Sequence, residues 1–197
     1  MPPDTRKALL QAATRLLDEG GVDAVTLREV GRLAGVSHNA PYKHFTRKEA
    51  LLAALAAEEL TRRNAALTEV IERSPGPEAA LRTAMRDYIA WALDHPARFK
   101  LVFGTWTIHS PELATAADDA QATLVGLVAA AQRAGALPGG DPVRLASLLR
   151  ALAHGAADLG SAGHLSSGGK GNADPGELVD DLIDYLRVAT RDARSPA

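Results

Sequence analysis

The chain contains no cysteine, which excludes disulfide bonds and thiolate metal sites and gives no sign of an oxidising compartment. It also lacks a charge-free apolar run of the roughly 18 residues that cross a membrane. The first residues, Met-Pro-Pro-Asp-Thr-Arg-Lys, have no apolar core of the kind that signal peptides carry. We therefore expect a cytoplasmic protein without a membrane partner.

A strong excess of one charge is also missing, since the formal net charge is −2. The charge is nevertheless uneven along the chain. Residues 1–50 hold eight Lys and Arg against six Asp and Glu, a net charge of +2. Phosphate binding depends on where cations cluster and not on their total. The balance therefore permits nucleic-acid binding by the N-terminal part without predicting it.

Motifs of catalysis and of cofactor binding are missing as well. We find no nucleophile elbow, no phosphate-binding loop and no dinucleotide fingerprint. Among the six histidines, no two have the His-x₃-His spacing that places two metal ligands on one helix face. The sequence predicts no metal site, no cofactor and no enzyme activity, and leaves an enzyme as a remote alternative.

The residues that are present predict an all-α fold. Helical spacing of apolar residues recurs throughout, and alternating β-branched runs do not occur. We expect a first helix that Gly20-Gly21 stops, a second that Thr26 caps, a third of about seven residues that Ser37 caps, and a fourth that Thr46 caps. Five further helices are predicted at 78–94, 96–103, 111–135, 142–160 and 175–192.

The second and third predicted helices have the proportions of a helix-turn-helix. Gly35 allows a left-handed turn between them, Val36 fills their angle, and Ser37 begins the next helix. In such a unit the second helix enters the major groove and presents its N-terminal side chains to base edges. The same spacing is also common in ordinary helical pairs, so the spacing by itself leaves DNA binding open.

Residues 26–51 resemble the DNA-binding domain of the tetracycline-repressor (TetR) family. The resemblance rests on Ala-Gly-Val-Ser at 34–37, Tyr-x-His-Phe at 42–45 and Lys-Glu-x-Leu at 48–51, and it extends over about residues 5–55. A weaker resemblance, of residues 94–99 and of Ala153-His154-Gly155, is to the subgroup with a Trp…His-Gly C-terminal domain. The tryptophan expected four residues before that histidine is Arg150.

The family resemblance implies phosphate contacts from Thr26, Tyr42, His44 and Lys48, side chains of types that commonly bind phosphates. Asn39 and Arg28 are the predicted base readers, because Asn pairs bidentately with adenine and Arg with guanine. The whole predicted DNA-binding set is Thr26, Arg28, Ser37, His38, Asn39, Tyr42, Lys43, His44 and Lys48. The predicted partner is a double-stranded DNA operator.

Aromatic residues are scarce, at 4% of the chain, but four of them fall between positions 91 and 106. Small-molecule sites are largely apolar cavities with a few fixed polar groups. The predicted effector site comprises Met85, Tyr88, Trp91, Phe99, Phe103, Trp106, His109 and His154, and its ligand is an apolar or aromatic small molecule. The alternative is that these aromatics only build the core of the second domain.

The last two predicted helices carry leucines at helical spacing and are the predicted homodimer face, with packing inside one chain as the alternative. The predicted domains are 1–50, a three-helix DNA-binding domain, and 51–197, a larger helical ligand-binding and dimerisation domain. The predicted function is a ligand-responsive transcriptional repressor. A regulator that activates transcription, or that responds to a protein partner, is the alternative.

Overall fold

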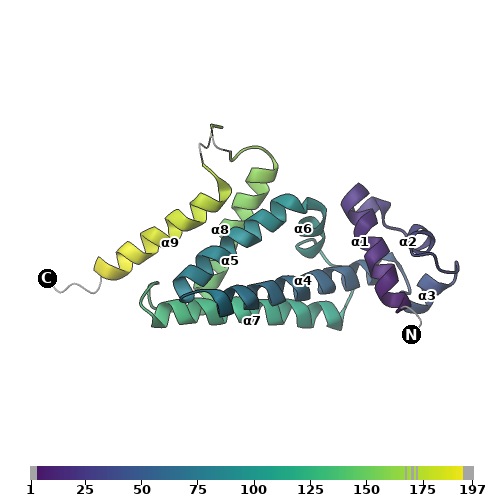
Figure 1. The fold of residues 1–197 in the computed structure, drawn as a ribbon, viewed down its shortest axis with the longest axis horizontal. Helices are drawn as coiled ribbons and strands as arrows, with labels where there is room; N and C mark the ends of the chain where they lie inside the picture. Colours follow the sequence, from purple (N-terminus) through teal and green to yellow (C-terminus); the bar gives the residue numbers. More distant parts are fainter. Residues whose placement is uncertain (1–3, 167, 170, 172, 193–197) are drawn as a thin grey trace. The chain divides into compact units, whose positions relative to one another are not determined.

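The computed structural model describes residues 4–166, 168–169, 171 and 173–192 of the chain. Within these ranges the regular structure consists of nine helices and no strand, which confirms the predicted all-α fold (Figure 1). Contacts divide the chain into two compact units. Unit 1 comprises residues up to Arg63 together with His95–Asp119, and unit 2 comprises Asn64–Asp94 together with residues from Ala120 onward.

Unit 1 begins with α1 (Thr5–Ala24), whose amides at Arg6 and Lys7 are capped by the carboxylate of Asp4. Helical geometry breaks at Gly20 and Gly21, as predicted, but one more turn follows to Ala24. Gly21 has a φ of 67°, a conformation that favours glycine. The break lets the chain turn into α2.

Helices α2 (Leu27–Leu33) and α3 (Ala40–His44) both pack on α1, and Figure 1 shows the three together. Their shared core contains fully buried apolar side chains, among them Leu9, Leu17, Val25, Val30 and Leu51. Helix α6 (Pro96–Val102) also packs on α1. Residues 95–119 therefore belong with the N-terminal helices by contact, although they lie outside the predicted domain 1–50.

Helix α4 (Lys48–Arg73) begins two residues after the predicted cap at Thr46. The carbonyl of Arg47 accepts a hydrogen bond from the amide of Leu51 over 3.3 Å, which places the helix start at Arg47. Both α4 and α7 (Pro111–Arg133) contribute residues to each unit. The predicted functional boundary at residue 50 remains a prediction.

Unit 2 is built on α5 (Pro77–Asp94), α8 (Pro142–Ser161) and α9 (Pro175–Asp192), which all pack on one another. The bounds of α5 to α9 differ by at most two residues from those predicted. Two of these starts are capped by aspartate, since Asp141 accepts from the amide of Val143 and Asp174 from the amide of Gly176. An aspartate cap followed directly by a proline thus marks each of these two helix starts.

Two neighbouring leucines of α8, a helix of the predicted dimer face, lie in different surroundings. Leu149 is fully buried among the helices of its own unit, together with Leu81, Val179 and Ile183. Its neighbour Leu148 is 64% exposed. A helix that packs on two others buries one side only, so the two leucines point to different surroundings. Among the described residues, no helix is long and apolar enough to cross a membrane.

Candidate nucleic-acid interface

The connection between α2 and α3 is a Schellman turn. The amide of Gly35 donates to the carbonyl of Arg32 over 3.2 Å, and the amide of Val36 donates to the carbonyl of Gly31 over 3.1 Å. Gly35 has a φ of 68°, which confirms the left-handed turn predicted for it. These bonds satisfy the last carbonyls of α2 and fix the direction in which the chain leaves it.

The start of α2 is capped as predicted, because the Thr26 hydroxyl accepts a hydrogen bond from the amide of Glu29 over 3.2 Å. The Glu29 side chain binds the guanidinium of Arg32, with 2.8 Å between Oε2 and Nε. This ion pair engages Arg32, whereas Arg28, the predicted base reader of α2, is exposed.

The start of α3 differs from the prediction. The helix begins at Ala40 with Asn39 as its cap residue, and it has five residues instead of about seven. Ser37, His38 and Asn39 form a turn in which the Ser37 carbonyl accepts from the amide of Ala40 over 2.9 Å. The predicted Ser37 cap is therefore wrong: the amide of Ala40 bonds to the backbone carbonyl of Ser37, and Pro41 at the second helical position has no amide that needs a cap.

Close packing between α2 and α3 depends on Gly31. A Cβ atom at this position would lie 2.8 Å from Cγ of Pro41, whose ring is fully buried. The missing side chain therefore allows the two helices to touch. The sequence prediction missed this contact, although a glycine inside a short helix was the available signal.

The predicted DNA-binding side chains lie on the outside of this unit. Eight of the nine are exposed, namely Thr26, Arg28, Ser37, His38, Asn39, Tyr42, Lys43 and His44, while Lys48 is half-buried. Tyr42 is 49% exposed, and its ring lies 5.9 Å from that of His38. Phe45, in contrast, is buried and anchors α3 in the core. The polar face of α3 is therefore available to a partner.

The predicted effector residues fall into both units. In unit 2, Tyr88 of α5 and His154 of α8 are joined by a hydrogen bond of 3.0 Å between Oη and Nδ1. The Tyr88 ring also lies 6.1 Å from that of Trp91, and both Trp91 and Met85 are buried. This part of the predicted set forms one contiguous group.

Unit 1 holds the other predicted effector residues. The rings of Phe99 and Phe103 lie 5.3 Å apart, with Phe99 buried and Phe103 40% exposed. Trp106 is half-buried, and its indole Nε1 is buried without a hydrogen-bond partner among the described residues. His109 is exposed. Whether these residues bind a ligand stays a prediction.

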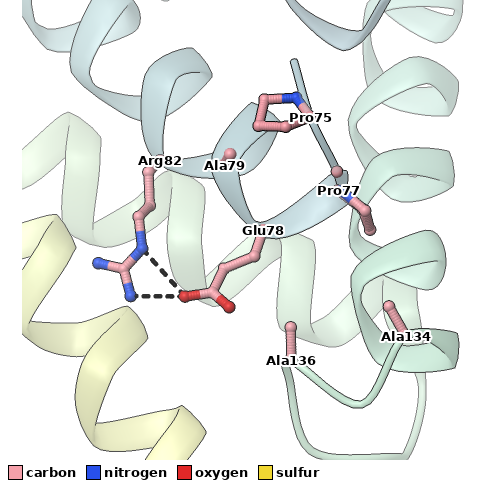
Figure 2. Close-up of a pocket in the computed structure, with 8 residues that line it drawn as sticks. Pro75, Pro77, Glu78, Ala79, Arg82, Ala134 and Ala136 are labelled. Carbon is pink, nitrogen blue, oxygen red and sulfur yellow. Dashed lines mark hydrogen bonds and ion pairs between the residues drawn. The ribbon is translucent and has the colours of Figure 1, made fainter.

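A surface pocket of about 430 Å³ lies in unit 2 at the turn before α5 (Figure 2). Its lining consists of Pro75, Gly76, Pro77, Glu78, Ala79, Arg82, Ala134 and Ala136. Figure 2 shows the Arg82 guanidinium held by Glu78, and Arg82 also contacts Asp184 over 2.7 Å. Both charged side chains of the lining, Glu78 and Arg82, are thus engaged in ion pairs, and none of the described lining belongs to the predicted effector set.

A helix-turn-helix with an exposed polar second helix is an arrangement through which DNA-binding proteins enter the major groove. The family model for "Bacterial regulatory proteins, tetR family" matches residues 9–55, and that for "Tetracyclin repressor-like, C-terminal domain" matches residues 81–186. The chain belongs to the tetracycline-repressor family. These matches do not assign the Trp…His-Gly subgroup, which stays a prediction.

Individual relatives agree with the family. The HTH-type transcriptional regulator BetI of Rhizobium meliloti is 46% identical over 54 residues, which are 27% of this chain and 27% of BetI. The chain thus matches about a quarter of the length of that curated relative.

Two solved structures resemble the whole chain. A protein of unknown function from Rhodococcus sp. RHA1 is 32% identical, with a TM-score of 0.81 over 96% of this chain and 98% of its own. The transcriptional regulator FadR of Bacillus subtilis, solved in complex with stearoyl-CoA, has a TM-score of 0.68 and 16% identity over 91% of this chain and 96% of its own. The latter likeness concerns the fold alone.

Proposed function

We propose that the protein is a dimeric transcriptional repressor that binds an operator in double-stranded DNA and leaves it when a small molecule binds. The observation that carries DNA binding is the division of α3 and its preceding turn into two faces. Pro41 and Phe45 are buried against the unit, while His38, Asn39 and Lys43 are exposed. Such a helix offers its polar side to the major groove. The protein then acts in the cytoplasm, where bacterial DNA lies.

Asn39 and Arg28 read base edges, because their amide and guanidinium groups match the donor and acceptor pattern of adenine and guanine. Thr26, Tyr42, His44 and Lys48 bind phosphates and fix the position of the unit on the duplex. Ser37, His38 and Lys43 complete the contact surface. Eight of these nine side chains are exposed in the free chain and Lys48 is half-buried, which supports these roles.

The chain works as a homodimer, because one short recognition helix gives too few contacts for a specific site, and two half-sites need two such helices. The partner-binding surface is formed by α8 and α9. Large apolar side chains are exposed there, namely Val143, Leu148, Leu159, Tyr185 and Val188. Two copies that join these helices form a four-helix bundle and bury that surface.

The effector is an apolar or aromatic small molecule. The C-terminal family match and the aromatic residues near α5 and α6 support this assignment. In unit 2 the Tyr88–His154 pair supplies polar groups next to the buried Trp91 and Met85. In unit 1 the Phe99–Phe103 ring pair and the unpartnered Trp106 indole supply an apolar surface and a hydrogen-bond donor.

DNA binding is tested by selecting sites from random double-stranded DNA and measuring the affinity of selected sites by fluorescence anisotropy. Asn39→Ala should cost about 1–3 kcal/mol at the selected site and relax its preference at one base position. Lys48→Ala should weaken binding to all sequences and reduce the slope of log K against log salt by about 1. Arg133→Ala, an exposed cation of unit 2 outside the predicted interface, is the control. Selection that yields no preferred sequence contradicts the proposal.

The switch is tested by titrating the purified dimer, with and without the selected DNA, with a panel that includes stearoyl-CoA and smaller aromatic acids. Binding of an effector should change tryptophan fluorescence and weaken DNA binding. Linkage requires that DNA weakens effector binding by the same factor, typically about 5–150-fold. Phe103→Ala should reduce effector affinity while ligand-free DNA affinity stays unchanged. A reporter gene behind the selected site separates repression from activation, and a response to a protein partner alone contradicts the small-molecule switch.

A further inference from the structure

Helix α1 is tied near both of its ends to residues 95–119. Asp18, near the C-terminal end of α1, contacts Arg98 of α6. Arg6, near the N-terminal end, contacts Glu112 in the first turn of α7. Arg98 and Glu112 lie outside the predicted DNA-binding domain and outside the matched residues 9–55. All four side chains belong to unit 1.

The contact of Arg98 is a bidentate, partly buried ion pair. Its Nε donates to Oδ1 of Asp18 over 2.8 Å, and its Nη2 donates to Oδ2 over 2.6 Å. Its Nη1 lies 3.5 Å from Oε2 of Glu59 on α4, whose side chain is only 6% exposed. Arg62 also holds that oxygen over 2.8 Å. Bidentate guanidinium–carboxylate pairs fix geometry as well as distance, so α6 holds α1 and α4 in one orientation.

The electrostatics of this group keep it ionised. The hydrogen bond from the Arg98 guanidinium holds the pKa of the Asp18 carboxyl below its ordinary value, and the coulombic attraction of the same guanidinium adds to the effect. Burial of the Asp18 carboxyl acts in the opposite direction and is outweighed. The pair is therefore charged at neutral pH.

The contact of Arg6 is more exposed but reaches the recognition helix. Its Nη2 donates to both carboxylate oxygens of Glu112, over 3.0 and 2.7 Å. Its guanidinium carbon also lies 5.7 Å from the ring centroid of Phe45, the buried residue that ends α3. Glu112 thus holds the cation that covers the end of α3. An exposed pair of this kind is weaker than a partly buried one.

We propose that Arg98 and Glu112 are positioning residues for DNA recognition, which hold α1 at both ends so that α2 and α3 keep the orientation that the operator requires. This inference rests on the proposed DNA-binding function. Because α1 packs on both α2 and α3, a change in its orientation moves the recognition helix. The unit that reads DNA therefore includes Arg98 and Glu112, although neither of them needs to contact DNA.

The sign of a charge change separates positioning from simple attraction. Removing an acidic group from a DNA-binding unit weakens its repulsion of phosphates and by itself tightens binding. The proposal predicts the opposite for Asp18→Asn, a loss of operator affinity of about 2- to 30-fold. Glu19→Gln removes a charge from the next residue, which is exposed, and should leave affinity unchanged or slightly increased. An Asp18→Asn variant that binds as tightly as Glu19→Gln overturns the proposal for this contact.

The salt dependence separates positioning from phosphate contact. Arg98→Gln should lower operator affinity over the same range without changing the slope of log K against log salt, because no phosphate contact is lost. The double variant Asp18→Asn/Arg98→Gln should bind no more weakly than Arg98→Gln, since both changes break one contact. Arg98→Lys keeps the charge and should retain part of the affinity. A slope reduced by about 1, or losses that simply add, contradicts the positioning role.

Glu112 is tested in the same way at the other end of α1. Glu112→Gln should weaken operator binding by about 2- to 10-fold, a smaller loss because the pair is half-exposed. Asp118→Asn on the same helix is the matched control, since Asp118 is exposed and no ion pair is described for it. Equal affinities of the two variants contradict the role of Glu112.

Hydrogen exchange decides the question without DNA. Amides of α1 and α3 should exchange faster in Asp18→Asn and Arg98→Gln than in the wild type, while amides of α8 and α9 exchange at unchanged rates. Unchanged exchange in α1 and α3 overturns the proposal even if affinity falls. If the wild type selects no DNA, the proposed function fails, and the exchange rates still show whether these ion pairs hold α1.

Discussion

Gly31→Ala tests whether the contact between α2 and α3 needs a glycine. The added Cβ would lie 2.8 Å from Cγ of Pro41, at least 0.6 Å short of an ordinary van der Waals contact. Pro41 is a rigid, fully buried ring, so the strain cannot be relieved by a rotamer change. Overpacking of this kind costs about 1–3 kcal/mol. Alanine returns up to about 1 kcal/mol of helix propensity over glycine.

The matched control is Gly126→Ala in α7, where an added Cβ meets nothing within 4 Å. This change should raise the free energy of unfolding by about 0.5–1 kcal/mol, because only the propensity term acts. Gly31→Ala should instead lower it by up to about 2 kcal/mol, so that the two variants differ by about 1–3 kcal/mol. Urea unfolding followed by circular dichroism measures both values.

The outcome also bears on DNA. A shift of α3 away from α2 moves the side chains that face the groove, so Gly31→Ala should lose operator affinity even at temperatures where it is fully folded. The reasoning is wrong if Gly31→Ala is stabilised as much as Gly126→Ala. In that case Pro41 and Gly31 are not in the contact described above.

Three further results are expected. Leu148→Asp should abolish the dimer while the monomer stays folded, because Leu148 is 64% exposed within one chain. Sedimentation at micromolar concentration measures the oligomeric state, and a wild type that is monomeric at that concentration refutes the proposed interface. The Asp18 carboxylate stabilises the fold above its ordinary pKa of 3.8, and this stability is lost as the pH falls through its lowered folded pKa. The difference in unfolding free energy between wild type and Asp18→Asn should therefore close below about pH 4, and a difference that stays constant contradicts the assignment. Tyr88→Phe should lower the free energy of unfolding by about 0.5–1.5 kcal/mol, because it removes the hydrogen bond to His154. Urea unfolding measures this value, and an unchanged free energy shows that the hydrogen bond does not stabilise the fold.

Local signals in the sequence were sufficient for most of the secondary structure. The bounds of the five helices after α4 were predicted to within two residues, because the signals at a helix start are local: aspartate accepts from neighbouring amides, and proline presets its own φ. The turn at Gly35 was equally local, since its positive φ follows from the missing side chain. The start of α3 was predicted wrongly, because Ser37 is a good cap residue by type, whereas in the structure its backbone carbonyl accepts from Ala40 and the helix begins without a side-chain cap bond from Asn39.

The motif at residues 34–51 was sufficient for the family, and the exposed polar face of α3 agrees with the predicted DNA contacts without testing them. The effector set could not be resolved in this way. Its eight residues are divided between two units, which periodicity along one helix does not reveal. An apolar residue that lines a cavity and one that only fills a core follow the same sequence pattern.

Caps, turns and the order of helices were determined by the sequence alone, because each depends on residues within a few positions of one another. Tertiary structure decided which helices share a unit, that Gly31 meets Pro41, and that Arg98 and Glu112 hold α1. Asp18 and Arg98 are 80 residues apart, as are many other acid and base pairs that never meet. Such partners are selected by packing of the whole chain, and a sequence pattern of short range carries no record of that choice.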